Sequence, residues 1–174
     1  MGKLNKEYLM PFSLTVLIII LDQISKAFIV ANWPQSGTLI KDVFRNGFLL
    51  IFHIRNKAIA FSLGDNVPQQ FRYVLFVIVP ILVLVLLALY YFRTVEFSRL
   101  QRWAIAGIIG GGLGNIIDRI FRIDGVVDFI SVKFYGLFGM ERWPTFNIAD
   151  SSVVICCLVL FFTMIKQERK RPSE

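Results

Sequence analysis

The sequence is poor in the residues that usually build metal sites, disulfides and histidine-dependent catalysis. It has one histidine, His53, and two cysteines, Cys156 and Cys157. Neighbouring cysteines in a helix point in different directions, so we interpret this pair as small apolar packing residues. Nothing near His53 offers metal-ligand spacing, and a lone histidine in an apolar run gives little support for a serine–histidine arrangement. The sequence therefore predicts no metal and no cofactor.

Charged residues are also scarce. They make up 18% of the chain, whereas hydrophobic residues make up 56%, and the mean hydropathy is +0.64. This composition indicates an integral membrane protein rather than a soluble one. The formal net charge is +7, but the cations lie beside apolar runs, so anionic lipid headgroups are expected as partners and nucleic acid is not. The length of 174 residues fits one domain over residues 1–174.

Four apolar runs are long enough to span a bilayer as helices. They cover residues 11–31, 73–92, 103–120 and 146–165, each close to the ~20 residues that a span requires. The first has a basic start like a secretory signal peptide, but it lacks a small-residue cleavage site and contains Asp22 and Lys26. We therefore expect it to be retained as a helix.

The distribution of cations predicts the orientation. Similar numbers of Lys and Arg fall on the two sides, but those near the termini and residues 93–102 are denser and lie beside helix ends. Both termini are therefore expected in the cytoplasm. The two long loops then lie outside, on the periplasmic face, and the apolar segments 48–54 and 126–134 within them predict extended strands. The expected fold is mainly α, with four transmembrane helices and a small outer β-sheet or cradle with an extended loop.

Two aspartates lie next to apolar runs, where a membrane-spanning chain tolerates carboxylates least. Asp128 follows the third span, and Asp150 stands at the head of the fourth. Because both can reach one depth, they form a candidate carboxyl pair that shares a proton and activates water. Each also has a structural interpretation: Asp150 as an acid in the first turn of its helix, and Asp128 as a loop partner of Arg122 or Lys133.

Other polar residues accompany the spans. Asp22 and Lys26 are four residues apart on one helix face, which predicts an ion pair that is compatible with supporting a site in the bundle. Asn147 suits either a helix cap or a substrate contact. The third span ends in a polar cluster of Asn115, Asp118 and Arg119, which orients a catalytic group or satisfies loop carbonyls.

Glycines are concentrated in the third span. Gly107, Gly111 and Gly114 share a helix face with Asp118. No strand leads into these glycines, so a phosphate-binding loop is a poor match. Small residues at such spacing allow helices to approach closely, and the pattern predicts a packing surface.

Five segments occur in a characteristic order: 22–26, 56–62, 110–119, 126–129 and 146–151. With four spans between and around them, they resemble the bacterial lipoprotein signal peptidases, also called signal peptidase II. The resemblance implies an intramembrane aspartic endopeptidase of the bacterial inner membrane. Such an enzyme removes signal peptides from diacylglyceryl-modified prolipoproteins, cutting before the lipid-modified cysteine.

The resemblance also implies roles for individual residues. The catalytic aspartates of the family fall on Asp128 and Asp150. Its other functional positions fall on Asp22, Lys26, Asn56, Asn115, Arg119 and Asn147. Peptide antibiotics such as globomycin are implied as inhibitors, and a monomer is expected. One motif departs from the family: Ala58 and Ile59 stand where Gly and Ala are usual, which predicts a different local backbone.

Two other function classes compete with a peptidase. Buried Asp22, Lys26, Asp118 and Asp150 suit a proton pathway or small transporter, although the sequence shows no paired repeats or interrupted helices. A structural membrane subunit with glycine-mediated contacts is the second alternative. Neither predicts peptide hydrolysis, so a cleavage assay distinguishes them from a peptidase.

Overall fold

A computed structural model describes residues 6–56 and 68–169. Within them, helices are α1 (Lys6–Leu9), α2 (Phe12–Asn32), α3 (Gln69–Tyr73), α4 (Val79–Arg93), α5 (Arg99–Phe121) and α6 (Ile148–Glu168). A π-helical turn, η2 (Val74–Ile78), joins α3 to α4, and a short 3-10 turn, η3 (Leu137–Gly139), follows the last strand. The strands are β1 (Thr38–Asp42), β2 (Leu49–Asn56) and β3 (Val126–Val132). The expected mainly helical membrane fold with a small sheet is confirmed.

Four helices of the described chain are long and apolar enough to cross a membrane, as the sequence predicted. They cover Lys6–Asn32, Phe71–Arg93, Arg99–Phe121 and Ile148–Glu168. The second extends beyond the predicted residues 73–92 because α3, η2 and α4 are continuous. It is also not regular, since the π-helical turn interrupts its α-helical hydrogen bonding. The span is nevertheless continuous, and its π-helical turn was not predicted from the sequence.

Local capping explains where α5 and α6 begin. The Ser98 side chain accepts a hydrogen bond from the Gln101 backbone, and the Gln101 side chain accepts one from the Ser98 backbone. Asn147 and Asp150 make the same reciprocal arrangement at α6. Such capping boxes satisfy backbone N–H groups that a helix start leaves without partners. They set the starts of α5 and α6 at Arg99 and Ile148, rather than at the first residues of the predicted spans.

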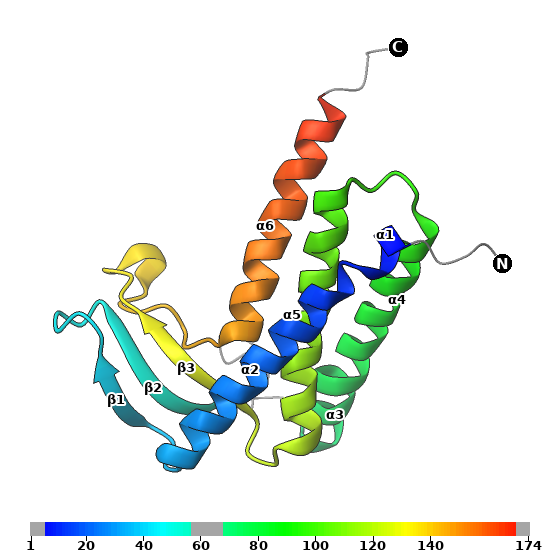
Figure 1. Ribbon diagram of the computed structural model, residues 1–174. Coiled ribbons are helices and arrows are strands. Elements are labelled where there is room, and N and C mark those ends of the chain that lie inside the picture. The colour runs from blue at the N-terminus through cyan, green and yellow to red at the C-terminus, as the bar shows by residue number, and fades with distance from the viewer. Residues whose placement is uncertain (1–5, 57–67, 170–174) are drawn as a thin grey trace.

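Helix α5 forms the centre of the bundle, in contact with α2, α4 and α6 (Figure 1). Its glycines make these contacts possible. A Cβ at Gly111 would lie 2.4 Å from the Ala149 carbonyl oxygen of α6, and one at Gly110 would lie 3.0 Å from Thr15 Cα of α2. The predicted glycine packing surface is confirmed, and it faces two helices rather than one.

The three strands form an antiparallel sheet in the order β1-β2-β3. The predicted strand at 48–54 corresponds to β2, and the predicted extended segment at 126–134 contains β3. The short strand β1 was not predicted. In the register of β2 and β3, Ile54 pairs with Asp128 and Asn56 pairs with Val126. The sheet therefore places Asn56 and Asp128 near one another.

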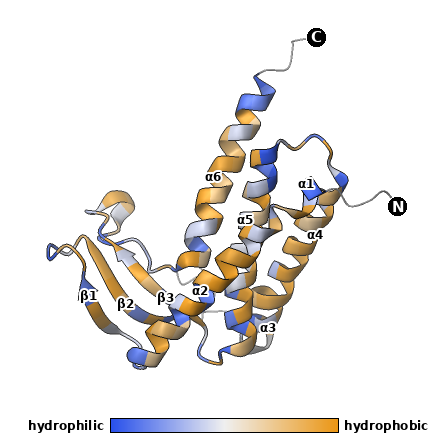
Figure 2. Ribbon diagram, in the orientation of Figure 1, coloured by the Kyte–Doolittle hydropathy of each residue, from blue (hydrophilic) through white to orange (hydrophobic). Residues whose placement is uncertain are grey.

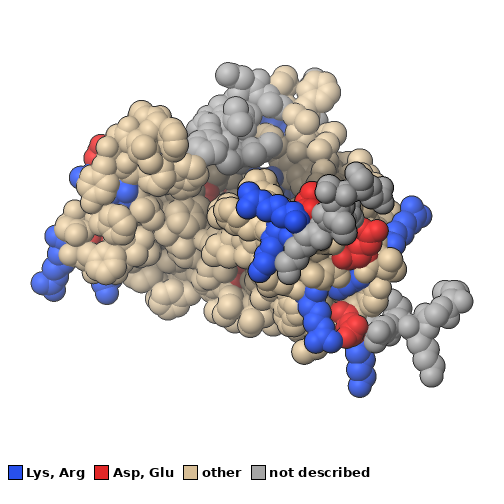
Figure 3. Space-filling model, turned by 90° about the horizontal axis from the view of Figure 1, so that it is seen from above, with Lys and Arg blue, Asp and Glu red and all other residues tan. Residues whose placement is uncertain are grey.

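The sheet lies at one end of the bundle and both termini lie at the other (Figure 1). Apolar residues cover most of the helix lengths between these ends (Figure 2). Seen from the terminal end, Lys and Arg side chains gather around the helix ends (Figure 3). The residues there include Lys6, Arg93, Arg99, Lys166 and Arg169. This arrangement agrees with a multi-pass membrane protein whose polar surfaces lie at the two ends of the bundle.

Candidate active site

Asp128 lies in the middle of β3 and is 2% exposed. Two side-chain amides hold its carboxylate: Asn56 Nδ2 donates to Oδ2 at 2.9 Å, and Asn147 Nδ2 donates to Oδ1 at 2.7 Å. The alternative pairing with Arg122 or Lys133 was wrong. Arg122 pairs with Asp118, and Lys133 pairs with Glu141. The Asp128 carboxylate is thus buried among neutral donors.

Asp150 occupies the first turn of α6, within reach of α5. Asn115 Nδ2 of α5 donates to its Oδ1 at 2.7 Å, and the Asn147 backbone N–H donates to its Oδ2 at 3.1 Å. The proposed capping role of Asp150 and of Asn147 is confirmed, since the two residues form the capping box of α6. Capping fixes the Asp150 carboxylate in position, while Oδ1 points to the side chain of another helix.

Asn147 and Asn115 connect the two aspartates. Asn147 Nδ2 donates to Asn115 Oδ1 at 3.0 Å as well as to Asp128, and Asn115 in turn donates to Asp150. The backbone supports this arrangement, because Phe146 bridges to Ile130 of β3 through paired hydrogen bonds. The sheet and α6 are therefore joined between the two aspartates, and a short chain of amides links their carboxylates.

Both aspartates line one cleft of about 400 Å³. Asn56, Asn115 and Arg119 also line it, together with Pro80. A neighbouring apolar groove of about 380 Å³ shares Asp150 with the cleft. Its other walls are Val132, Phe134, Trp143, Phe146, Ser151, Val154 and Ile155. The cleft thus combines carboxylate, amide and guanidinium groups with apolar walls, and an apolar groove adjoins it.

Burial dominates the protonation of Asp128. It raises the pKa of this carboxyl to about 7, and the nearby Asp150 charge also raises it. Hydrogen bonds from Asn56 and Asn147 and the charge of Lys26 act in the opposite direction by favouring the ionised form. Asp128 is consequently able to exchange a proton near neutral pH, which an ordinary aspartate is not.

A second cluster, of the fully buried Asp22, Lys26 and Asp118, contacts the residues of the site. Lys26 Nζ lies 2.8 Å from Asp22 Oδ2 and 3.1 Å from Asp118 Oδ2. It also donates to Asn115 Oδ1 at 3.0 Å, so the cluster and the amide chain share an atom. Asp22 accepts the Ala149 backbone N–H of α6 at 3.0 Å. Both predicted roles of Asp22 and Lys26 are present together: an ion pair and a support.

The sequence did not predict the supporting contacts of Asp118 and Gln23. Asp118 Oδ2 accepts the Val127 backbone N–H at 3.1 Å, directly before Asp128. Gln23 Nε2 donates to Asp22, to Asp118 and to the Gly114 carbonyl. From the sequence, Asp118 was placed in the polar end of the third span, on the glycine face and among the charges of a possible proton pathway, but not in contact with the segment of Asp128. Its position one turn from Asn115 on a glycine-lined face was the available signal.

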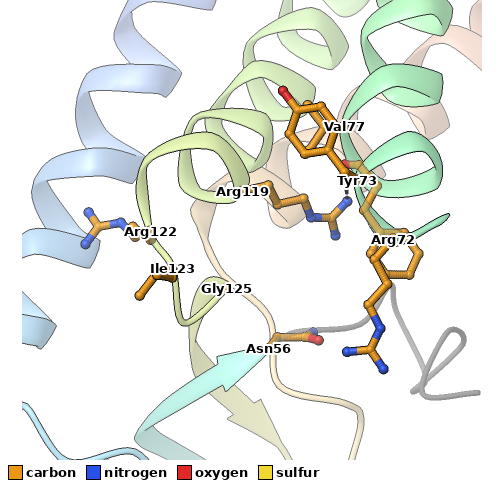
Figure 4. A pocket seen from close by; sticks show the side chains of 9 residues that line it. Asn56, Arg72, Tyr73, Val77, Arg119, Arg122, Ile123 and Gly125 are labelled. Carbon is orange, nitrogen blue, oxygen red and sulfur yellow. Dashed lines mark hydrogen bonds between the residues drawn. The ribbon is translucent and has the colours of Figure 1, made fainter. Parts of the chain in front are cut away.

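Arg119 stands between the cleft and a second pocket of about 470 Å³, which Asn56, Arg72 and Arg122 also line (Figure 4). Its Nη1 donates to the Phe76 carbonyl of η2 at 3.0 Å. Arg122 points away from Arg119 in this view. Of the segment 56–62, only Asn56 is described, so the departures at Ala58 and Ile59 lie outside the described residues.

His53 and the cysteines take no part in this cleft. His53 is fully buried in β2, with Nδ1 facing the Trp33 carbonyl at the end of α2. Cys156 and Cys157 lie on α6, where Cys156 Sγ packs against Gly107. Across residues 6–56 and 68–169, no three His, Cys, Asp or Glu side chains form a group suited to hold a metal ion.

Comparison with known proteins identifies the family. Residues 14–166 match the family described as signal peptidase (SPase) II. The lipoprotein signal peptidase of Treponema pallidum is 42% identical over 172 residues, which cover 99% of this chain and 91% of that protein. The protein of the same description from Treponema denticola is 44% identical over 169 residues, covering 96% and 95%. A solved bacterial membrane enzyme superposes with a TM-score of 0.76 at 28% identity, covering 95% of this chain and 93% of that one.

Proposed function

The chain belongs to the signal peptidase II family and acts as a lipoprotein signal peptidase, and from that premise we propose that it is an intramembrane aspartic endopeptidase. Asp128 and Asp150 are its catalytic pair. The observation that carries the proposal is their common cleft, in which Asn147 and Asn115 link the two carboxylates. Family membership makes prolipoproteins the substrates.

In the proposed reaction the pair holds one proton. The ionised carboxylate takes a proton from water, whose oxygen attacks the carbonyl carbon of the scissile peptide bond. The protonated carboxyl donates a hydrogen bond to the carbonyl oxygen and stabilises the charge that develops there. When the C–N bond breaks, a proton from the pair goes to the leaving amine. The products are a signal peptide with a free carboxylate and a lipid-modified cysteine with a free amine.

The raised pKa of Asp128 supports this division of roles. A pair of nearby carboxyls loses its two protons in separate steps that belong to the pair. Burial that raises the pKa of Asp128 to about 7 keeps one proton on the pair near neutral pH. The amides of Asn56, Asn115 and Asn147 donate to the carboxylates without bringing a positive charge. These neutral donors favour the ionised form less than a lysine or arginine at the same distance would, so burial still keeps a proton on the pair.

The polar and apolar walls of the cleft support a lipid-modified substrate. We assign the peptide and the ester linkage of the diacylglyceryl group to Asn56, Asn115, Arg119 and Asn147. Asp22 and Lys26 hold α2 and α5 in register with Asn115 and α6. The apolar groove beside Asp150 suits the substrate's hydrocarbon chains. Peptide antibiotics of the globomycin type are proposed to compete for the same cleft.

The position of the cleft supports a location near one membrane surface. Residues of β2, β3 and helices α4 to α6 line it. The sheet lies at the end of the bundle opposite the termini (Figure 1). We propose that this end faces outward from the bacterial inner membrane, with both termini in the cytoplasm. Water can then reach the aspartates while acyl chains stay in lipid. One chain contributes all residues of the proposed pair and its amide donors, so a monomer is the expected active form.

A cleavage assay with two matched precursors tests the proposed function. The pure protein in detergent receives a prolipoprotein with a diacylglyceryl-modified cysteine, or the same precursor without the lipid. Mass spectrometry should find one cut, directly before the modified cysteine, and much slower cleavage of the unmodified precursor. Absence of cleavage, or a cut elsewhere in the precursor, would contradict the proposal.

A further inference from the structure

The second span changes its hydrogen bonding beside the cleft. In the π-helical turn Val74–Ile78, the Val79 N–H donates to the Val74 carbonyl, five residues earlier rather than four. Pro80 follows immediately and lines the cleft. π-helical turns inside α-helices often occur at functional sites because they redirect side chains and carbonyls. The altered hydrogen bonding of this turn therefore points to a nearby group that it positions.

Pro80 removes one particular donor from this helix. An N–H at residue 80 would donate to the carbonyl of residue 76 in the α-helical register, or to that of residue 75 in the five-residue register of the turn, but proline has no N–H. The Phe76 carbonyl instead accepts a hydrogen bond from Arg119 Nη1 of α5 at 3.0 Å. The dashed line at the Arg119 guanidinium in Figure 4 marks this bond. A side chain from another helix thus takes the place of the missing backbone donor.

The same contact fixes where Arg119 lies. The guanidinium carbon is 5.6 Å from the centre of the Phe76 ring, and the Phe76 side chain is buried. Arg119 lines both the cleft with the two aspartates and the pocket of Figure 4. A free arginine side chain has large rotamer entropy, which it must lose each time it binds a substrate. An arginine already held by a carbonyl loses less, so its charge is preorganised at the cleft wall.

We propose that Pro80 is a positioning residue, because its missing N–H leaves the Phe76 carbonyl to hold Arg119 at the wall of the cleft. In this arrangement the Arg119 charge meets the polar linkage between the peptide and the lipid of the substrate. The inference rests on the proposed function for its effect on catalysis. The hydrogen-bond exchange itself concerns the helix and is independent of the reaction.

A set of variants separates the missing N–H from the shape of the proline ring. Pro80→Ala restores the backbone donor, whereas lactic acid incorporated at position 80 replaces the amide by an ester and restores none. We expect Pro80→Ala to lower kcat/KM about tenfold or more, mainly through KM, because Arg119 is released from its anchor. The ester variant should retain activity close to that of the wild type. Leu82→Ala, at an exposed position of the same helix, is the control for altered composition.

Thermal unfolding tests the hydrogen-bond exchange without any substrate. Arg119→Ala should lower Tm in the wild-type background, where it leaves the Phe76 carbonyl without the arginine donor. In the Pro80→Ala background the loss should be clearly smaller, because the new N–H serves that carbonyl. Equal Tm losses in both backgrounds, or a Pro80→Ala variant with unchanged kcat/KM, would overturn the inference. If the wild-type protein does not cleave, the proposed function fails. The Tm comparison alone then tests the inference about Pro80 and Arg119.

Discussion

Buried carboxylates in this bundle are held by two different kinds of donor. Asp22 and Asp118 face the ammonium of Lys26, which compensates their charge. Asp128 and Asp150 accept hydrogen bonds from neutral amides. Both a cation and an amide donor favour the ionised carboxylate, but the neutral amides do so without a full charge, so burial keeps the pKa of Asp128 raised. The two sets of aspartates thus differ within one network: the first holds helices together, and the second is the pair that we propose performs the acid–base chemistry.

The pKa of Asp128 makes a pH prediction. Activity requires one proton on the pair, so kcat/KM should fall as the pH rises through about 7, where that proton is lost. The hydrogen bond from Asn56 favours the ionised form of Asp128 and lowers its pKa. Asn56→Ala removes this bond, so the pKa of Asp128 should rise. The alkaline limb of this variant should therefore move to higher pH, whatever the change in maximal rate. Asn46→Ala, in an exposed turn, is the control. A limb that moves to lower pH would contradict this role of Asn56.

Lys26 makes a stability prediction. Lys26→Met leaves the buried Asp22 without its cation and Asp118 with Arg122 as its remaining cation, and breaking a buried pair typically costs about 3–5 kcal/mol of unfolding free energy. Arg99→Met breaks the ion pair between Arg99 and Glu7, and these two side chains are 88% and 56% exposed. Exposed ion pairs contribute less than about 1 kcal/mol to the unfolding free energy. Denaturant unfolding in detergent should separate the two variants clearly. Equal losses would show that the buried cluster does not hold the bundle.

Between elements, the close approach of α5 and α6 sets the distance between Asn115 and Asp150. A Cβ at Gly111 would meet the Ala149 carbonyl and Ser152 Oγ at 2.4 Å, and neither belongs to a flexible side-chain end that can move far. At Gly112 the nearest atoms, at 2.9 Å, belong to the end of the Leu84 side chain. A side chain at Gly111 would thus meet the backbone of α6, whereas one at the adjacent Gly112 would meet a side chain that can move.

This difference can be measured. Gly111→Ala should push α6 away from α5 and lower the unfolding free energy by about 1–3 kcal/mol, the usual cost of overpacking. Gly112→Ala should cost less, because Leu84 can change rotamer and alanine favours the helix over glycine. Thermal or denaturant unfolding of the two variants decides. A larger loss for Gly112→Ala would contradict the packing described for α5.

Hydropathy made the spans predictable, but contacts between distant segments were not. Apolar runs indicated all four helices, and apolar β-branched segments indicated β2 and most of β3. Strand β1 is five residues long and includes Lys41 and Asp42, so its sequence alone gave little signal. The π-helical turn lies beside Pro80 and is contacted by Arg119 of another helix, and hydrophobic periodicity does not reveal such a contact.

The sequence indicated which residues belong to the candidate site, but not which hydrogen bonds connect them. Rare carboxylates beside apolar runs, and the family motifs, indicated Asp128 and Asp150. The link through Asn147 and Asn115 joins residues 32 positions apart, and Asp22 meets Ala149 across 127 positions. Such relations follow only from the packed bundle. The same holds for Asp128, whose expected loop partners Arg122 and Lys133 are bound elsewhere.

For the whole molecule, polarity at the two ends predicts how it sits in the membrane. The sheet and cleft lie at one end, and the termini with their cations lie at the other (Figures 1 and 3). Ile123, near the sheet, is 98% exposed, and Val95, near the cationic end, is 76% exposed. These two positions report opposite sides of the membrane in the proposed orientation.

Cysteine labelling tests this orientation. In a background without Cys156 and Cys157, Ile123→Cys should react with an impermeant maleimide in intact spheroplasts. Val95→Cys should react only after the membrane is opened. The reverse pattern would place the cleft on the cytoplasmic side and contradict the proposed arrangement.

The central claim is that Asp128 and Asp150 together hydrolyse the peptide bond. It is tested most directly by cleavage of a diacylglyceryl-modified precursor by pure wild-type protein, Asp128→Asn, Asp150→Asn and the exposed control Asp124→Asn. Each of the two cleft variants should lose at least about a hundredfold in rate, as expected for loss of an acid–base group, while unfolding with a cooperative transition. Asp124→Asn should cleave like the wild type. Near wild-type cleavage by either Asp128→Asn or Asp150→Asn would contradict the account.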